Sequence, residues 1–197
     1  MEIGILGAGQ VGLAVGHRLV GAGHHVKLSS ARGPAALTPV AQGIGAEAVS
    51  ITEAAAQELV LLALPWPAVP DVIDPLPDWQ GRILVDATNP FVTFDPLQLA
   101  DLKGRSASVI VAEHASGARM VKAFNSITMA NFEKGPQQGE ARRVLFVSGD
   151  DVASKQTVQD LITELGYAAI DLGSLDEGGR MQQPGGPLAG QDLLVNQ

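Results

Sequence analysis

The chain contains no cysteine, and this absence removes three classes of site at once. Disulfides, thiolate nucleophiles and zinc–sulfur centres all require that residue. Basic residues are also few, with 13 Lys and Arg against 21 Asp and Glu, for a formal net charge of −8. Such a balance offers no electrostatic attraction to nucleic acid or to an anionic membrane surface. We therefore expect neither of these partners.

Long apolar runs are missing as well. None approaches the roughly 20 residues needed to cross a bilayer, and the first residues lack the basic region of a signal peptide. We expect a cytoplasmic protein. Aromatic residues make up only 4% of the chain although 46% is hydrophobic, which is typical of aliphatic helix-on-sheet layers. A chain of 197 residues is long enough to bury a sizeable core.

Glycines at fixed spacing follow the first apolar run. Residues 1–6 are succeeded directly by Gly7-Ala8-Gly9-Gln10-Val11-Gly12, and an amphipathic segment then continues to residue 20. In a dinucleotide fingerprint the first glycine allows the strand-to-helix turn, the second lets backbone approach a pyrophosphate, and the third allows close packing. The pyrophosphate lies at the positive end of the helix. We infer dinucleotide binding; the alternative is a glycine-rich turn in another α/β protein.

Alternating strand and helix patterns continue along the chain. They predict an α/β fold of the Rossmann type, a doubly wound and mainly parallel sheet of about eight strands. We expect strands at 2–6, 25–29, 46–50, 59–64, 83–86, 119–124, 143–148 and 167–171, and helices at 10–20, 52–58, 107–114 and 152–165. Residues 133–140 are predicted to be a mobile loop. Residues 1–197 form one domain, with a core at 1–171 and a Gly/Pro-rich C-terminal arm at 172–197 that serves as a lid or a dimer contact.

The second predicted strand ends in Ser29-Ser30-Ala31-Arg32. NAD-binding sheets place an acid near this position to hold the ribose 2′-hydroxyl, but no carboxylate lies between Glu2 and Glu47. Two hydroxyls and a guanidinium suit a 2′-phosphate instead. We therefore predict NADP(H), with Ser29, Ser30 and Arg32 on the phosphate and Lys27 as a weaker candidate. The alternative is a solvated arginine in a serine-rich turn.

Further cofactor contacts are expected at the carboxyl ends of the other strands, where ligands bind in open α/β sheets. Leu64, Pro65 and Trp66 end one strand; Trp66 either flanks the nicotinamide or caps the core. Asn89 precedes Pro90 in a rigid or cis turn and either presents its amide to the nicotinamide ribose or only makes a turn. Asn125 follows the sixth strand, where it either bonds the carboxamide or the acceptor or makes a plain turn.

No catalytic dyad is evident, and hydride transfer between two rings needs placement more than acid–base groups. We assign no catalytic residue. None of the four histidines has metal-ligand spacing, so we expect no metal site. Lys122 lies inside a predicted strand, where we expect it to face a helix or solvent. That position argues against a hydroxy-acid dehydrogenase, whose catalytic lysine lies on a helix.

Several longer motifs carry a resemblance to one family. They are the glycine fingerprint, Leu64-Pro65-Trp66, residues 85–90 (VDATNP), residues 121–127 (VKAFNSI), residues 146–151 (FVSGDD) and the stretches at 165–167 and 171–175. Together they resemble the coenzyme F420-dependent NADP oxidoreductases and the related cytosolic domain of six-transmembrane metalloreductases. The resemblance covers nearly the whole chain. It implies hydride transfer between NADP(H) and a deazaflavin (coenzyme F420) or flavin-like ring, recognition of the 2′-phosphate at Ser30 and Arg32, and a homodimer.

The resemblance is weakest at the C-terminus. The chain ends soon after residues 183–188 (QPGGPL) and lacks the long apolar C-terminal helix of many relatives. This departure leaves the binding site of the small-molecule redox acceptor less well defined than the binding site of NADP(H). Two other functions remain open: a nonenzymatic NADP(H)-binding sensor or accessory protein, and an NADPH-dependent reductase of another small substrate. The latter would need a helical second domain, which only a partner subunit could supply.

Overall fold

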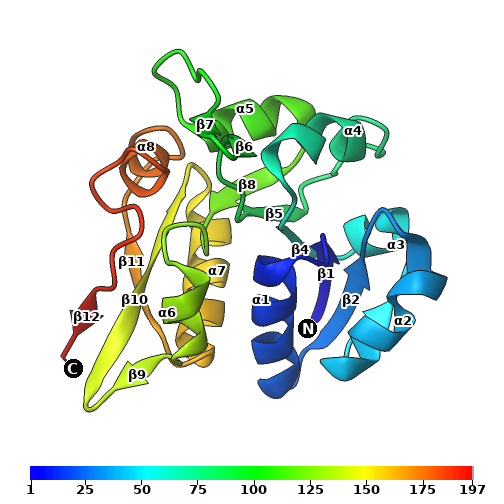
Figure 1. Ribbon diagram of the computed structural model, residues 1–197, viewed down its shortest axis with the longest axis horizontal. Coiled ribbons are helices and arrows are strands. Elements are labelled where there is room, and N and C mark those ends of the chain that lie inside the picture. Colours follow the sequence, from blue (N-terminus) through cyan, green and yellow to red (C-terminus); the bar gives the residue numbers. More distant parts are fainter. Residues whose placement is uncertain (197) are drawn as a thin grey trace.

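A computed structural model describes residues 1–196, and its central feature is a mainly parallel sheet (Figure 1). Eight strands follow in the order β11-β10-β8-β5-β4-β1-β2-β3. Their bounds are β1 Glu2–Leu6, β2 His25–Ser29, β3 Glu47–Ala48, β4 Leu59–Leu62, β5 Ile83–Asp86, β8 Arg119–Lys122, β10 Ala141–Gly149 and β11 Ala168–Asp171. All neighbours are parallel except β8 and β10. The predicted fold class is confirmed.

Helices connect these strands and cover both faces of the sheet. Their bounds are α1 Gln10–Gly21, α2 Gly33–Gly43, α3 Ile51–Ala55, α4 Val69–Ile73, α5 Ala107–His114, α6 Met129–Glu133, α7 Val152–Glu164 and α8 Glu177–Gln182, with a short 3₁₀ helix η1 at Trp66–Ala68. Several predictions match closely, including β2, β5 and α5. Helix α2, the small helices α4, α6 and α8, and the hairpin described below were not predicted.

The apolar core consists of two clusters, and successive side chains of a strand contribute to one or the other. In β4, Leu59 and Leu61 pack into a cluster with side chains of α1, α2, α6 and α7, while Val60 and Leu62 pack with α3, α4 and α5. Successive side chains point to opposite faces of a strand, so a strand buried on both faces must be apolar throughout. All four residues of β4 are buried, as that rule requires.

Two additions lie outside the parallel order. Strands β9 (Gln137–Gln138) and β12 (Leu194–Val195) pair antiparallel with β10, so part of the expected loop at 133–140 is a strand. Strands β6 (Phe91–Phe94) and β7 (Leu97–Leu99) form a separate two-stranded hairpin. None of the helices in the described chain combines the length and apolarity that a membrane crossing needs. Within residues 1–196, no three His, Asp or Glu side chains gather as metal ligands.

Candidate functional site

A cleft of about 390 Å³ lies at the carboxyl ends of β1, β4, β5 and β8. The strand order changes direction between β1 and β4, which is where open α/β sheets bind ligands. The cleft brings together the predicted residues Gly9, Gln10, Val11, Leu64, Pro65, Trp66, Asn89 and Asn125. Sequence reasoning therefore found the main walls of this cleft.

The three fingerprint glycines have different structural reasons. Gly7 has φ +117°, and a Cβ there would lie 2.3 Å from the Ala63 carbonyl oxygen. A Cβ on Gly12 would lie 2.0 Å from the Gly7 carbonyl oxygen. Protein packing thus requires both of these glycines. A Cβ on Gly9 would meet nothing within 4 Å, although Gly9 lines the cleft.

Gly9 is also the N-cap of α1 and makes no side-chain capping bond. The first N–H groups of a helix need partners from outside the helix, and here no side chain caps them. The open space beside Gly9 and this uncapped helix end fit an anionic group, which the helix dipole favours. Ala8 is half-buried behind them and packs against the core.

The three residues predicted to hold a 2′-phosphate, at the end of β2, differ in their burial and in their hydrogen bonds. Ser29 is fully buried, and its hydroxyl donates to the Ile5 carbonyl at 2.9 Å. Ser30 is half-buried, and its hydroxyl accepts from the Arg32 backbone N–H at 3.3 Å. The exposed Arg32 guanidinium makes no ion pair within the described residues. Ser30 and Arg32 are thus the two of these residues that are not fully buried.

Lys27 lies on the same strand but extends in a different direction. Its Nζ is 3.6 Å from a carboxylate oxygen of Glu2, at the opposite edge of the sheet from the cleft. The weaker phosphate candidate is therefore tied to the amino-terminal ends of the strands. Among residues 1–196, Arg32 alone offers a positive charge at the carboxyl end of β2.

Trp66 lies between the cleft and the core, and its position next to the nicotinamide stays a prediction. It is the first residue of η1, it lines the cleft, and its half-buried ring also packs against the core cluster that contains Val69 and Ile73. Pro65 immediately precedes η1, which begins four residues after the last residue of β4, Leu62. The indole ring is thereby held at the wall of the cleft.

Asn89 and Asn125 bind each other across the cleft floor. The Asn89 amide nitrogen donates to the Asn125 carbonyl at 2.9 Å, and the Asn125 amide nitrogen donates to Asn89 Oδ1 at 3.1 Å. The Asn89–Pro90 bond is trans, since the only cis bond among residues 1–196 is Asp95–Pro96. Of the rigid or cis turn expected at Pro90, the cis form is therefore wrong. Phe124, just before Asn125, has φ +63°, a conformation unusual for a bulky residue.

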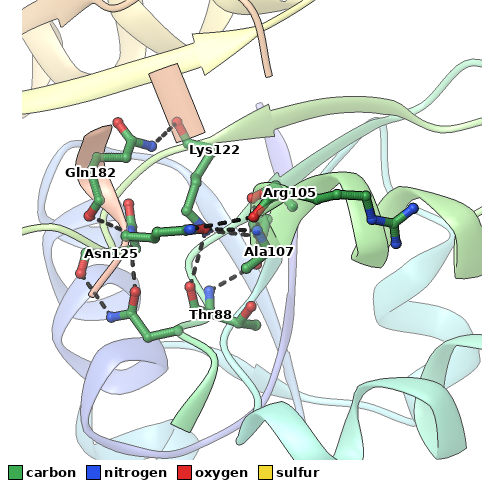
Figure 2. A network of polar contacts seen from close by, with 10 residues as sticks. Thr88, Arg105, Ala107, Lys122, Asn125 and Gln182 are labelled. Carbon is green, nitrogen blue, oxygen red and sulfur yellow. Dashed lines mark hydrogen bonds and ion pairs between the residues drawn. The ribbon is translucent and has the colours of Figure 1, made fainter. Parts of the chain in front are cut away.

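A buried ion pair that the sequence analysis missed is bonded to Thr88, which lines the cleft beside Asn89 (Figure 2). Lys122 and Asp86 are both fully buried, and Lys122 Nζ lies 3.1 Å from Asp86 Oδ2. The carboxylate also accepts from the Ser108 hydroxyl and, at 2.8 Å, from the Thr88 backbone N–H. Lys122 Nζ donates to the Thr88 carbonyl at 3.2 Å. Lys122 faces helix α8, where a Cβ on Gly179 would lie 3.7 Å from Lys122 Cδ, so of the two expected surroundings the helix is confirmed and solvent was wrong.

The C-terminal segment is joined to the same network (Figure 2). Gln182 is fully buried; its amide nitrogen donates to the Lys122 carbonyl at 3.1 Å, and its backbone carbonyl accepts from Asn125 at 3.0 Å. Gln183 Oε1 accepts from the Ala107 N–H at 2.7 Å, at the start of α5. Part of the predicted arm thus belongs to the packed domain. Its role as a lid or dimer contact remains a prediction.

Two buried polar atoms on the cleft walls have no partner in the described structure. They are the Asn125 side-chain oxygen and the Thr88 hydroxyl, on residues exposed by only 7% and 2%. Unsatisfied buried polar groups are rare and need an explanation. Their position in the cleft is consistent with a polar group of a ligand that supplies the missing bonds. The carboxamide of a nicotinamide has both a donor and an acceptor for them.

The comparisons with known proteins agree with this geometry. Residues 2–90 match the family described as NADP oxidoreductase, coenzyme F420-dependent. A crystal structure of the hypothetical protein SMa0349 from Sinorhizobium meliloti superposes with a TM-score of 0.92 at 37% identity, covering 100% of this chain and 96% of that one. A proposed F420-dependent NADP-reductase from Arthrobacter sp. FB24 matches with a TM-score of 0.69 at 26% identity, covering 89% and 86%.

Over residues 2–90 the chain thus resembles the coenzyme F420-dependent NADP oxidoreductases, and the similarity to the Arthrobacter protein extends over 89% of the chain. The resemblance noted in the sequence is thereby confirmed. The metalloreductase STEAP3 of Rattus norvegicus is a further relative, 26% identical over 175 residues, which are 88% of this chain and 34% of the rat protein. This chain therefore spans about one third of that relative's length. The prediction of an NADP-dependent oxidoreductase is confirmed at the level of the family.

Proposed function

We propose that the chain binds NADPH along the cleft and transfers hydride to a neutral planar ring, a deazaflavin such as coenzyme F420 or a flavin. The observation that carries the proposal is the absence of ionisable side chains from the cleft lining, beside the uncapped start of α1. A largely apolar cleft without charged side chains suits two stacked rings. It offers no cation for a carboxylate substrate and no acid to protonate a ketone or imine.

The residues present fit the cofactor at both ends. The N–H groups at the start of α1 and the space beside Gly9 suit the pyrophosphate. Ser30 and Arg32 suit the 2′-phosphate, because a guanidinium binds phosphate with two parallel donors. The unpartnered Asn125 oxygen and Thr88 hydroxyl suit the carboxamide. When bound, NADPH supplies a hydride, and the acceptor ring gains that hydride together with one proton from water.

The protein's own contribution is placement. The Asp86–Lys122 pair fixes both the N–H and the carbonyl of Thr88, and Asn89 and Asn125 fix each other. These bonds hold two strand ends in register beneath the reacting rings. Fixed geometry is what lowers the barrier of a transfer that needs no acid or base. A homodimer and a cytoplasmic location remain predictions.

The experiment that tests cofactor choice replaces Arg32 by alanine. We expect the dissociation constant for NADPH to rise about 10- to 100-fold, because a hydrogen bond between charged groups is worth about 1.5–3 kcal/mol. NADH, which has no 2′-phosphate, should bind with unchanged affinity. Lys27→Ala is the matched control, since this cation lies on the same strand but at the opposite sheet edge. Equal losses for both cofactors in Arg32→Ala would contradict the assignment.

The acceptor is tested by following NADPH oxidation with coenzyme F420, riboflavin and a keto acid in parallel. We expect turnover with at least one of the two rings and none with the keto acid, because no cation lines the cleft. Tight NADPH binding without turnover of any acceptor would favour the nonenzymatic sensor instead. Turnover of the keto acid alone would favour a reductase of a small substrate.

A further inference from the structure

The hairpin of β6 and β7 exposes more apolar surface than its size explains. Phe94 is 73% exposed and Leu97 is 64% exposed, and Val92 and Leu99 are each 40% exposed. The hairpin is nevertheless fixed in shape. The Ala100 N–H donates to the Pro90 carbonyl at 2.9 Å at its base, and the Thr93 hydroxyl donates to the Pro96 carbonyl at 2.6 Å at its turn. Exposed apolar surface on an ordered element is typical of a binding site.

An irregularity in the hairpin directs two aromatic rings to one side. Phe91 and Phe94 are three residues apart, so in a regular strand their side chains would point to opposite faces. The pairing register shifts between Phe91 and Thr93, and this bulge changes the alternation. As a result the two ring centroids are 5.1 Å apart, and both rings line the cleft. The bulge therefore places both phenyl rings on the cleft side.

The residues that face the hairpin across the cleft determine which molecule fits into the space between them. The hairpin packs near η1, which begins with Trp66, and the cleft floor includes Ile127 and Met129. No charged side chain lines this space. A second molecule in it must therefore be flat enough to lie between aromatic walls, and uncharged where it touches them. Aromatic rings favour such stacked or tilted contacts over contacts with aliphatic groups of equal size.

We propose that Phe91 and Phe94 form the outer wall of the acceptor subsite and that Phe94 determines the affinity for the acceptor's conjugated ring. The inference rests on the proposed function, because it takes the inner part of the cleft as the nicotinamide site. The occupant of this subsite is the ring of the hydride acceptor. We prefer it to a second copy of the chain because the hairpin surface is continuous with the cleft. Phe94 covers the open side of that ring and limits the access of water to it.

The test measures equilibrium binding, so that it does not depend on turnover. Riboflavin and coenzyme F420 are titrated, by quenching of their own fluorescence, into the protein saturated with NADP⁺, which cannot donate hydride. The variants are Phe94→Ala and Leu97→Ala. Leu97 is the matched control because it is exposed on the same hairpin but does not line the cleft. NADP⁺ affinity is measured separately by calorimetry, and the oligomeric state of each variant by light scattering.

We expect Phe94→Ala to weaken binding of the preferred ring about tenfold, the size of one lost aromatic contact. Leu97→Ala should bind it as the unaltered protein does, and all three proteins should bind NADP⁺ equally. Equal ring binding by Phe94→Ala and the unaltered protein overturns the proposal, as does the failure of both rings to bind. Dissociation of a dimer by both variants would show that a second copy covers the hairpin. If the unaltered protein does not bind NADP⁺, the result instead contradicts the proposed function.

Discussion

The buried pair of Lys122 and Asp86 makes the sharpest prediction about stability. Replacing Lys122 by methionine keeps most of the side-chain volume but removes the ammonium group. Asp86 then keeps its bonds from Ser108 and from the Thr88 N–H but loses its only cation, at 3.1 Å. Removing one partner of a buried ion pair typically costs about 3–5 kcal/mol, because the remaining charge is unpaired.

This loss is large for a domain of 197 residues. Folded domains are stable by about 5–15 kcal/mol in total, and a loss of this size lowers the midpoint of thermal unfolding by about 10 °C. Urea unfolding measures the change directly, because the buried indole of Trp79 reports the transition through its fluorescence. We expect the midpoint to fall and the slope to stay constant.

A double variant separates charge from packing. Lys122→Met combined with Asp86→Asn removes both charges and leaves an amide oxygen that can still accept from the Thr88 N–H. We expect this protein to recover at least half of the lost stability, since no unpaired charge remains. A loss below about 1 kcal/mol in the single variant would refute the reasoning. So would a double variant no more stable than the single one.

Three further predictions concern the fingerprint, the core and one helix cap. Gly9→Ala should abolish NADPH binding but leave the midpoint of thermal unfolding unchanged. Gly12→Ala should lower that midpoint, because its Cβ would collide with backbone. Calorimetry measures both the binding and the midpoint. Burial raises the pKa of Tyr167 to about 12. The contribution of Tyr167 to the free energy of unfolding is therefore complete below its unfolded pKa near 10 and is lost as the pH rises towards 12. Tyrosinate absorbance measures this titration directly, because the chain has one tyrosine. Asp151→Ala should cost about 1 kcal/mol in urea unfolding, since the carboxylate caps α7 by accepting from the Ser154 N–H.

Local patterns were sufficient for the main strands of the parallel sheet. The glycine fingerprint and the apolar strand at residues 59–62 define a parallel sheet, because only buried parallel strands are apolar on both faces. Helix α2 was not predicted, since Pro34 and Pro39 interrupt its pattern. The hairpin at residues 91–99 was missed for a related reason. Its strands are short and exposed, and no burial pattern marks them.

The polar network could not be predicted because it depends on which strands are neighbours. Asp86 is the last residue of β5 and Lys122 the last residue of β8, and neither charge by itself indicates a partner on the other strand. In the sheet β5 and β8 are adjacent, and Asp86 and Lys122 are direct register partners. Their charges therefore meet inside the domain. A pair of opposite charges ending two buried strands is the signal that could have revealed this.

The network also explains why the C-terminal segment lies where it does. Lys122 has its ammonium group on the Thr88 side of β8, and its backbone carbonyl accepts from Gln182. Gln182 in turn accepts from Asn125, whose remaining side-chain oxygen is unpartnered in the cleft. A chain of direct contacts thus joins α8 to the proposed carboxamide site. Displacing α8 would release one of the bonds that orient Asn125, so the segment from residue 177 to residue 183 supports a residue of the cleft without lining the cleft itself.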